Sequence, residues 1–107
     1  IPIPMNLGQP SIGLDKGPEK LLSGGLKTLL GDLGWRIKIS DPLIFTNTKP
    51  DPTNYSSINA KNCPEVGKGC EYIYNSVKQE IENDSFPLIL GGDHCISIGT
   101  VPAIKTF

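Results

Sequence analysis

The strongest constraint on the fold is a helical stripe of apolar residues that leads directly into a short apolar segment. The stripe has spacings of four, three, four and four residues and consists of Val66, Cys70, Ile73, Val77 and Ile81. This period predicts a helix with one buried face. Asn62 and Pro64 supply the expected N-cap and first turn, and the helix is expected to end near Asn83 and Asp84.

The apolar segment that follows, residues 86–90, predicts a central strand of a parallel sheet. Gly91 and Gly92 end this strand, Asp93 and His94 come next, and residues 95–99 are expected to begin another helix. Ligands of open parallel sheets bind beyond the carboxyl ends of the strands. His94 therefore lies where a binding site is expected.

The amino-terminal half predicts a similar alternation of strand and helix. Residues 1–5 are apolar but contain two prolines, so we expect the end of a strand that leads into a loop. Pro18 suits the first turn of a helix, which Gly24 and Gly25 are expected to bend or split. The apolar face of this helix would contain Leu22, Leu26, Leu29 and Leu33. Alternating polarity in residues 35–40 predicts a second strand.

A polar, proline-rich stretch at about residues 41–61 predicts a long loop between the two halves. The order of elements, strand, helix, strand, loop, helix, strand and helix, predicts an α/β fold with a parallel sheet. A chain of 107 residues allows one domain of modest core. We interpret residues 1–107 as part of one incomplete domain.

Charge and the distribution of apolar residues argue against several classes of function. Ten basic and eleven acidic residues occur without runs of like charge, so nucleic acid and anionic membranes are not expected partners. No apolar stretch approaches the roughly 18 residues of a spanning helix, and no basic region followed by an apolar block opens the chain, so a secretory signal is not expected. The first residue is Ile rather than Met, which suggests either processing or, more simply, a chain whose true start is missing.

The three cysteines, Cys63, Cys70 and Cys95, are too few and too irregular for a disulfide framework. They predict reduced thiols in a cytosol-like compartment, and the interval between Cys63 and Cys70 is not that of a zinc knuckle. The glycines match neither the dinucleotide fingerprint nor a phosphate-binding loop. Within the predicted second helix, the sequence Gly67-Lys68-Gly69 is interpreted as a site of close packing.

Side chains that follow the predicted strand at residues 86–90 are the candidates for chemistry. His94 suits a metal ligand or a base that titrates near neutral pH, and the Asp93 carboxylate is expected to fix the tautomer of its imidazole. A single imidazole makes no metal site, so a structural or capping role stays open. Ser97 lacks the partners of a catalytic nucleophile, and Cys95 is interpreted as a packed residue rather than a reactive thiol.

Two motifs in this chain resemble the arginase family of ureohydrolases. The segment Leu90–Gly99, LGGDHCISIG, is similar to the signature in which Gly-Gly-Asp-His-Ser leads into a helix. Upstream, Gly8-Gln9-Pro10, then Gly13 to Pro18, then Gly25-Leu26, look like the opening loop and first helix of arginases. Cys95 replaces the usual Ser, and Leu22 stands where arginases often carry Arg.

The resemblance implies the amino-terminal part of a three-layer α/β/α fold with a central parallel sheet. It implies a cluster of two Mn²⁺ ions at the carboxyl edge of the sheet, whose bridging hydroxide attacks the guanidinium carbon of L-arginine and releases L-ornithine and urea. His94 takes the position of one metal ligand. The other family ligands lie in Asp-Ala-His-x-Asp and Asp-x-Asp-x-x-Asp-Pro segments, which are absent here.

These absences predict a catalytically incomplete fragment with no catalytic residue of its own and with substrate-binding residues still unknown. The alternatives are another ureohydrolase, such as an agmatinase or a guanidino or formimino acid hydrolase, and a non-catalytic remnant. The resemblance implies a homotrimer or hexamer that acts in arginine metabolism. The cytoplasm is the default location, with mitochondria as the alternative because the true start of the chain is expected to be missing. An isolated chain with an open sheet edge is expected to be poorly soluble or molten.

Overall fold

We describe the protein from a computed structural model, which covers residues 1–42 and 62–107. The elements in chain order are β1 (Pro2–Ile3), η1 (Leu14–Lys16), α1 (Gly17–Ser23), α2 (Leu26–Asp32), α3 (Cys63–Glu82), β2 (Leu90–Gly91), η3 (His94–Ile96) and α4 (Ser97–Lys105). The predicted loop at about 41–61 lies outside the described residues except for its first two positions.

The two strands come from opposite ends of the chain and pair in parallel. Pro2 lies opposite Leu90 and Ile3 lies opposite Gly91. The Ile1 nitrogen donates to the Leu88 carbonyl at 2.8 Å, and the Leu90 amide donates to the Ile1 carbonyl at 3.0 Å. This pairing confirms the prediction of an α/β fold with a parallel sheet.

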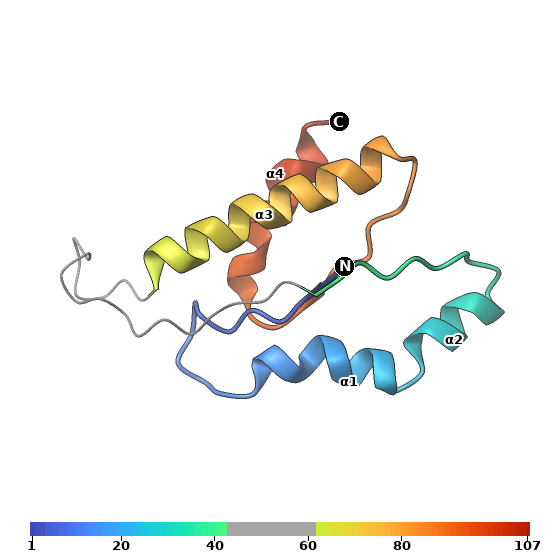
Figure 1. Cartoon of the computed structure of the whole chain (residues 1–107), viewed down its shortest axis with the longest axis horizontal. Helices are drawn as coiled ribbons and strands as arrows, with labels where there is room; N and C mark the ends of the chain where they lie inside the picture. Colours follow the sequence, from blue (N-terminus) through green and yellow to red (C-terminus); the bar gives the residue numbers. More distant parts are fainter. Residues whose placement is uncertain (43–61) are drawn as a thin grey trace.

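Helices cover the strand pair on both sides, as Figure 1 shows. Helix α1 packs against β1 and β2 on one side, and α3 and α4 pack together on the other. The fully buried side chains of the core come from β1, the residues after it, α3 and α4, and they are Ile3, Met5, Ile73, Val77 and Ala103. The strands therefore lie between two helical layers.

Helix α3 confirms the predicted apolar stripe. Cys70, Ile73 and Val77 are buried in it, and burial of such side chains is the main source of helix stability in proteins. Close packing was also predicted at residues 67–69. Gly69 is buried, but the prediction was wrong for Gly67, which is exposed and whose added Cβ would meet no other part of the described chain.

Asn62 stands at the N-cap position of α3 but makes no side-chain cap bond. Its backbone is left-handed, with φ of 53°, and its side-chain amide donates to the Leu7 carbonyl at 2.9 Å. The predicted N-cap position is therefore confirmed, but the side chain contacts the loop at Leu7 instead of capping the helix.

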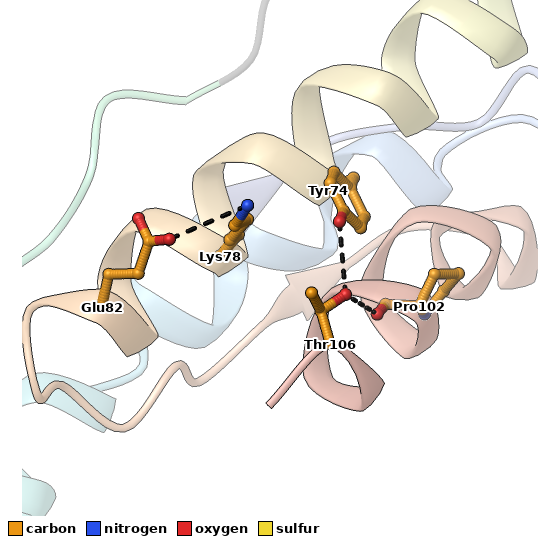
Figure 2. Close-up of polar contacts among 5 residues, drawn as sticks. All are labelled: Tyr74, Lys78, Glu82, Pro102 and Thr106. Carbon is orange, nitrogen blue, oxygen red and sulfur yellow. Dashed lines mark hydrogen bonds and ion pairs between the residues drawn. The ribbon is translucent and has the colours of Figure 1, made fainter.

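Polar contacts reinforce α3 along its length and toward α4 (Figure 2). The Thr106 hydroxyl bonds to the Pro102 carbonyl at 2.9 Å and lies 3.2 Å from the Tyr74 hydroxyl. One turn further along α3, Lys78 and Glu82 form an ion pair at 3.8 Å. The Tyr74 contact fixes the end of α4 against the middle of α3.

The predicted amino-terminal helix is split at Gly24 and Gly25, as expected, with Gly25 at φ of 99°. Helix α2 then extends away from the strands (Figure 1). Leu29 and Leu33 are consequently exposed, at 62% and 76%. The apolar face of this helix is therefore not buried by the described residues.

Residues 35–40 form no strand, which contradicts the prediction from their alternating polarity. Trp35 instead lies beside Phe86, with ring centroids 6.2 Å apart, and the Lys38 Nζ atom is 2.9 Å from Glu80 Oε1. A strand needs a neighbour for its backbone hydrogen bonds, and no other described segment pairs with residues 35–40. The predicted strand at 86–90 is also shorter than expected, since β2 begins at Leu90.

None of the helices in the two described ranges is long and apolar enough to cross a membrane.

Candidate metal site at the carboxyl end of β2

His94 lies just beyond the carboxyl end of β2, in the position that the sequence predicts. Strand β2 ends at Gly91, a two-residue turn follows, and His94 opens the short helix η3 with an exposed side chain. Together with residues of β2 and α4, it lines an open hollow of about 400 Å³. The ring is therefore accessible to a ligand, and its role in binding a metal stays a prediction.

Asp93 is buried beside this exposed ring, with 6% of its surface exposed. Its Oδ1 atom accepts hydrogen bonds from the Cys95 amide at 2.9 Å and the Cys95 thiol at 2.6 Å. Its Oδ2 atom accepts a third bond from the Gly8 amide at 2.9 Å. The carboxylate thus caps η3 and connects the turn to the loop after β1.

The expectation that Asp93 holds the His94 imidazole directly was wrong. Within residues 1–42 and 62–107, no hydrogen bond joins the two side chains, because the carboxylate turns inward to Gly8 and Cys95. A buried carboxylate requires hydrogen-bond donors, and these amides and the thiol supply them.

Cys95 is a packed residue, as predicted. Its Sγ atom lies 3.3 Å from the Met5 Sδ atom and donates to Asp93. Burial, followed by the hydrogen bond to Asp93 and its charge, raises the pKa of the Cys95 thiol to about 12. The thiol is therefore protonated at neutral pH, which excludes a reactive thiolate.

The remaining sulfur and hydroxyl groups near the site are also accounted for. Cys63, Cys70 and Cys95 form no disulfide in the part of the chain that the structure describes, and their reduced state stays a prediction. The Ser97 hydroxyl donates to the His94 carbonyl at 2.9 Å. This bond stabilises the first turn after His94 and gives no support to a nucleophilic role.

Two glycines allow the turn before His94 and the loop after β1 to approach closely. A Cβ atom at Gly92 would collide with the Met5 carbonyl oxygen and would lie 2.9 Å from the Leu14 carbonyl oxygen. A Cβ atom at Gly8 would collide with the Cys95 Sγ atom. The two family-like motifs, far apart in sequence, are therefore in direct contact, a relation that neither motif reveals alone.

His94 is compatible with one position in a metal coordination sphere. Neutral imidazole is a frequent metal ligand, although Mn²⁺ favours carboxylate oxygens. In the part of the chain that the structure describes, no group of three or more His, Cys, Asp or Glu side chains is arranged to hold a metal ion. A complete site thus requires donors other than these residues.

Comparison with known proteins gives a consistent result over the whole chain. The model of the Arginase family matches residues 1–107. The arginase of Saccharomyces cerevisiae is 38% identical over 94% of this chain, and that of Bacillus subtilis is 37% identical over 94%. A crystal structure of arginase from Bacillus subtilis superimposes with a TM-score of 0.84 at 33% identity, over 98% of this chain.

The chain spans about a third of the length of these relatives. The matched region is 34% of the Saccharomyces cerevisiae protein, 33% of the curated Bacillus subtilis protein and 34% of the Bacillus subtilis crystal structure. The structural match also confirms the predicted arginase-like α/β fold, of which this chain has the amino-terminal portion.

Proposed function

The chain belongs to the arginase family, and on this premise we propose that the whole protein hydrolyses L-arginine to L-ornithine and urea. The observation that carries the proposal is the match to arginases over residues 1–107, within which His94 follows a parallel strand. We further propose that these residues are one part of a domain completed by further sequence.

His94 is proposed to supply one imidazole nitrogen to a cluster of two Mn²⁺ ions. Such a cluster makes hydroxide available near neutral pH and holds it beside an electrophilic carbon. The exposed position of the His94 ring, over an open hollow, supports this role. The carboxylate ligands are proposed to come from sequence that this chain lacks, so the 107 residues alone are expected to be inactive.

The proposal extends to the partner and setting of the whole protein. Its ligand is proposed to be a small guanidino compound, and the nearly balanced charge argues against nucleic acid or an anionic membrane as a partner. Assembly as a homotrimer or hexamer and a cytoplasmic location, with mitochondria as the alternative, complete the proposal. The assembly follows from the family resemblance, and the location follows from the expected reduced thiols.

The proposed function is tested by assaying the whole protein, loaded with Mn²⁺, for release of urea and ornithine. Parallel assays should offer L-arginine, agmatine, and guanidino and formimino acids at equal concentrations. The proposal expects L-arginine to give the largest kcat/KM. Preferred turnover of another substrate would replace arginase with a related ureohydrolase, and absence of turnover with all of them would indicate a non-catalytic protein.

A His94→Asn variant provides the control for the metal role. Groups that only support a ligand typically contribute 10- to 100-fold to metal affinity, so loss of the ligand itself is expected to reduce Mn²⁺ affinity by at least that much. A variant that keeps both its Mn²⁺ content and its activity would contradict the assignment of His94.

A further inference from the structure

We propose that Asp93 is a positioning residue, which fixes the turn that presents the His94 imidazole to a metal ion without touching that ring. The inference deepens the proposed function and rests on it, because it requires His94 to be a metal ligand. It is carried by the hydrogen bonds of Asp93 and by the packing around them.

The first step is that the Asp93 carboxylate encloses His94 in a short closed loop. Asp93 precedes His94 and Cys95 follows it, and the Asp93 Oδ1 atom accepts the Cys95 amide hydrogen bond at 2.9 Å. A side chain that bonds to the backbone two residues further on fixes the conformation of the residue between them. The direction of the His94 Cα–Cβ bond is therefore fixed by its neighbour.

The second step is that this loop is anchored to a separate part of the chain. The Gly8 amide donates to Asp93 Oδ2, and the Asp93 amide donates to the Met5 carbonyl, both at 2.9 Å. Cys95 fills the space where Gly8 lacks a Cβ atom. The His94 turn therefore has little freedom to move relative to β1.

The third step is that the site requires a carboxylate in particular. Three donors, the Gly8 amide, the Cys95 amide and the Cys95 thiol, point at the two Asp93 oxygens. An asparagine has nearly the same shape, but its NH₂ group would face at least one of these donors. Asp93→Asn should therefore break the network with little change in volume.

Positional freedom at a ligand weakens metal binding, because ligands must be held to about 0.5 Å for productive geometry. Groups that orient a ligand typically contribute 10- to 100-fold to metal affinity. We expect Asp93→Asn to lower the affinity for the Mn²⁺ ion bound by His94 by a factor in this range.

The test is a titration of the whole protein with Mn²⁺, in which electron paramagnetic resonance measures free and bound Mn²⁺. Asp93→Asn should lose affinity and alter the signal of the bound ions. Val77→Ala, in the fully buried core of α3, is the matched control, which should lower Tm and leave Mn²⁺ affinity within about twofold.

Cys95 provides an independent test if Asp93→Asn fails to fold. Cys95→Ser keeps a hydrogen-bond donor for Asp93 and Cys95→Ala removes it, so the serine variant should bind Mn²⁺ more tightly than the alanine variant. Equal affinities in this pair, or unchanged affinity in a folded Asp93→Asn protein, would overturn the inference. If Asp93→Asn and Val77→Ala lowered Mn²⁺ affinity equally at the same change in Tm, the inference would also be overturned, because the effect would be general destabilisation.

The His94→Asn variant separates this inference from the function on which it rests. If His94→Asn loses Mn²⁺ and Asp93→Asn retains it, only the positioning role fails. If His94→Asn itself retains Mn²⁺, the proposed metal role of His94 fails, and the positioning role fails with it.

Discussion

Two Gly→Ala substitutions should have opposite effects on stability, because one glycine is enclosed and the other is open. At Gly92, the new Cβ atom would meet the carbonyl oxygens of Met5 and Leu14. Neither oxygen belongs to a side chain that can rotate away. Overpacking of this kind costs about 1–3 kcal/mol, and disruption of the Asp93–Met5 hydrogen bond adds about 1 kcal/mol. We expect Gly92→Ala to destabilise the protein by about 2–4 kcal/mol.

At Gly67, on the exposed side of α3, no atom of the described residues outside the helix's own nearby backbone lies within 4 Å of the new Cβ position. Alanine is favoured over glycine inside a helix by about 0.8–1 kcal/mol, so Gly67→Ala should stabilise α3. The two variants should thus differ by about 3 kcal/mol or more.

Native-state hydrogen exchange of the metal-free whole protein measures both effects locally. Removing the metal is essential, because bound ions would stabilise the folded state by mass action. The strand-pair amides should report the loss in Gly92→Ala, and the α3 amides should report the gain in Gly67→Ala. A Gly92→Ala protein within about 0.5 kcal/mol of the parent would refute the reasoning.

Two further predictions concern charge and protonation. Lys38→Ala removes an ion pair whose lysine side chain is 71% exposed. The substitution should therefore lower the free energy of unfolding, measured by hydrogen exchange, by at most about 1 kcal/mol. Because salt screens exposed ion pairs, a loss that persists in 1 M salt would contradict this prediction. Burial, followed by the charge of Asp93, raises the pKa of the Cys70 thiol above its ordinary value of 9.0. The folded state therefore keeps this proton where the unfolded state loses it, so the contribution to stability is complete below pH 9.0 and is lost as pH rises through the folded pKa. Cys70→Ala should flatten this decline above pH 9.0 in urea unfolding, and an unchanged slope would contradict the assignment.

Features determined by local sequence were predicted well. The stripe that includes Ile73 and Val77 predicted α3, and Gly24 and Gly25 predicted the split between α1 and α2. The glycines after the apolar run predicted that His94 follows a strand. In each case the periodicity or the backbone freedom of neighbouring residues is sufficient information.

Features determined by distant partners were not predicted. Residues 35–40 have the alternation of a strand, but strand formation depends on a neighbour that is not visible in that alternation. Asp93 was assigned to the adjacent His94 ring, whereas it bonds to Gly8, 85 residues away. The Asn62 side-chain amide likewise bonds to the Leu7 carbonyl, 55 residues away. The joint presence of the Gly8 and Gly92 motifs was the one signal of their contact.

The most direct test of the proposed metal role of His94 is to locate manganese relative to its imidazole ring. Crystals of the whole protein grown with Mn²⁺ can be examined by anomalous diffraction at the manganese absorption edge. We expect one of two neighbouring peaks to lie in direct contact with a ring nitrogen of His94. If the ring is ordered and every manganese peak lies away from both of its nitrogens, His94 is not a metal ligand.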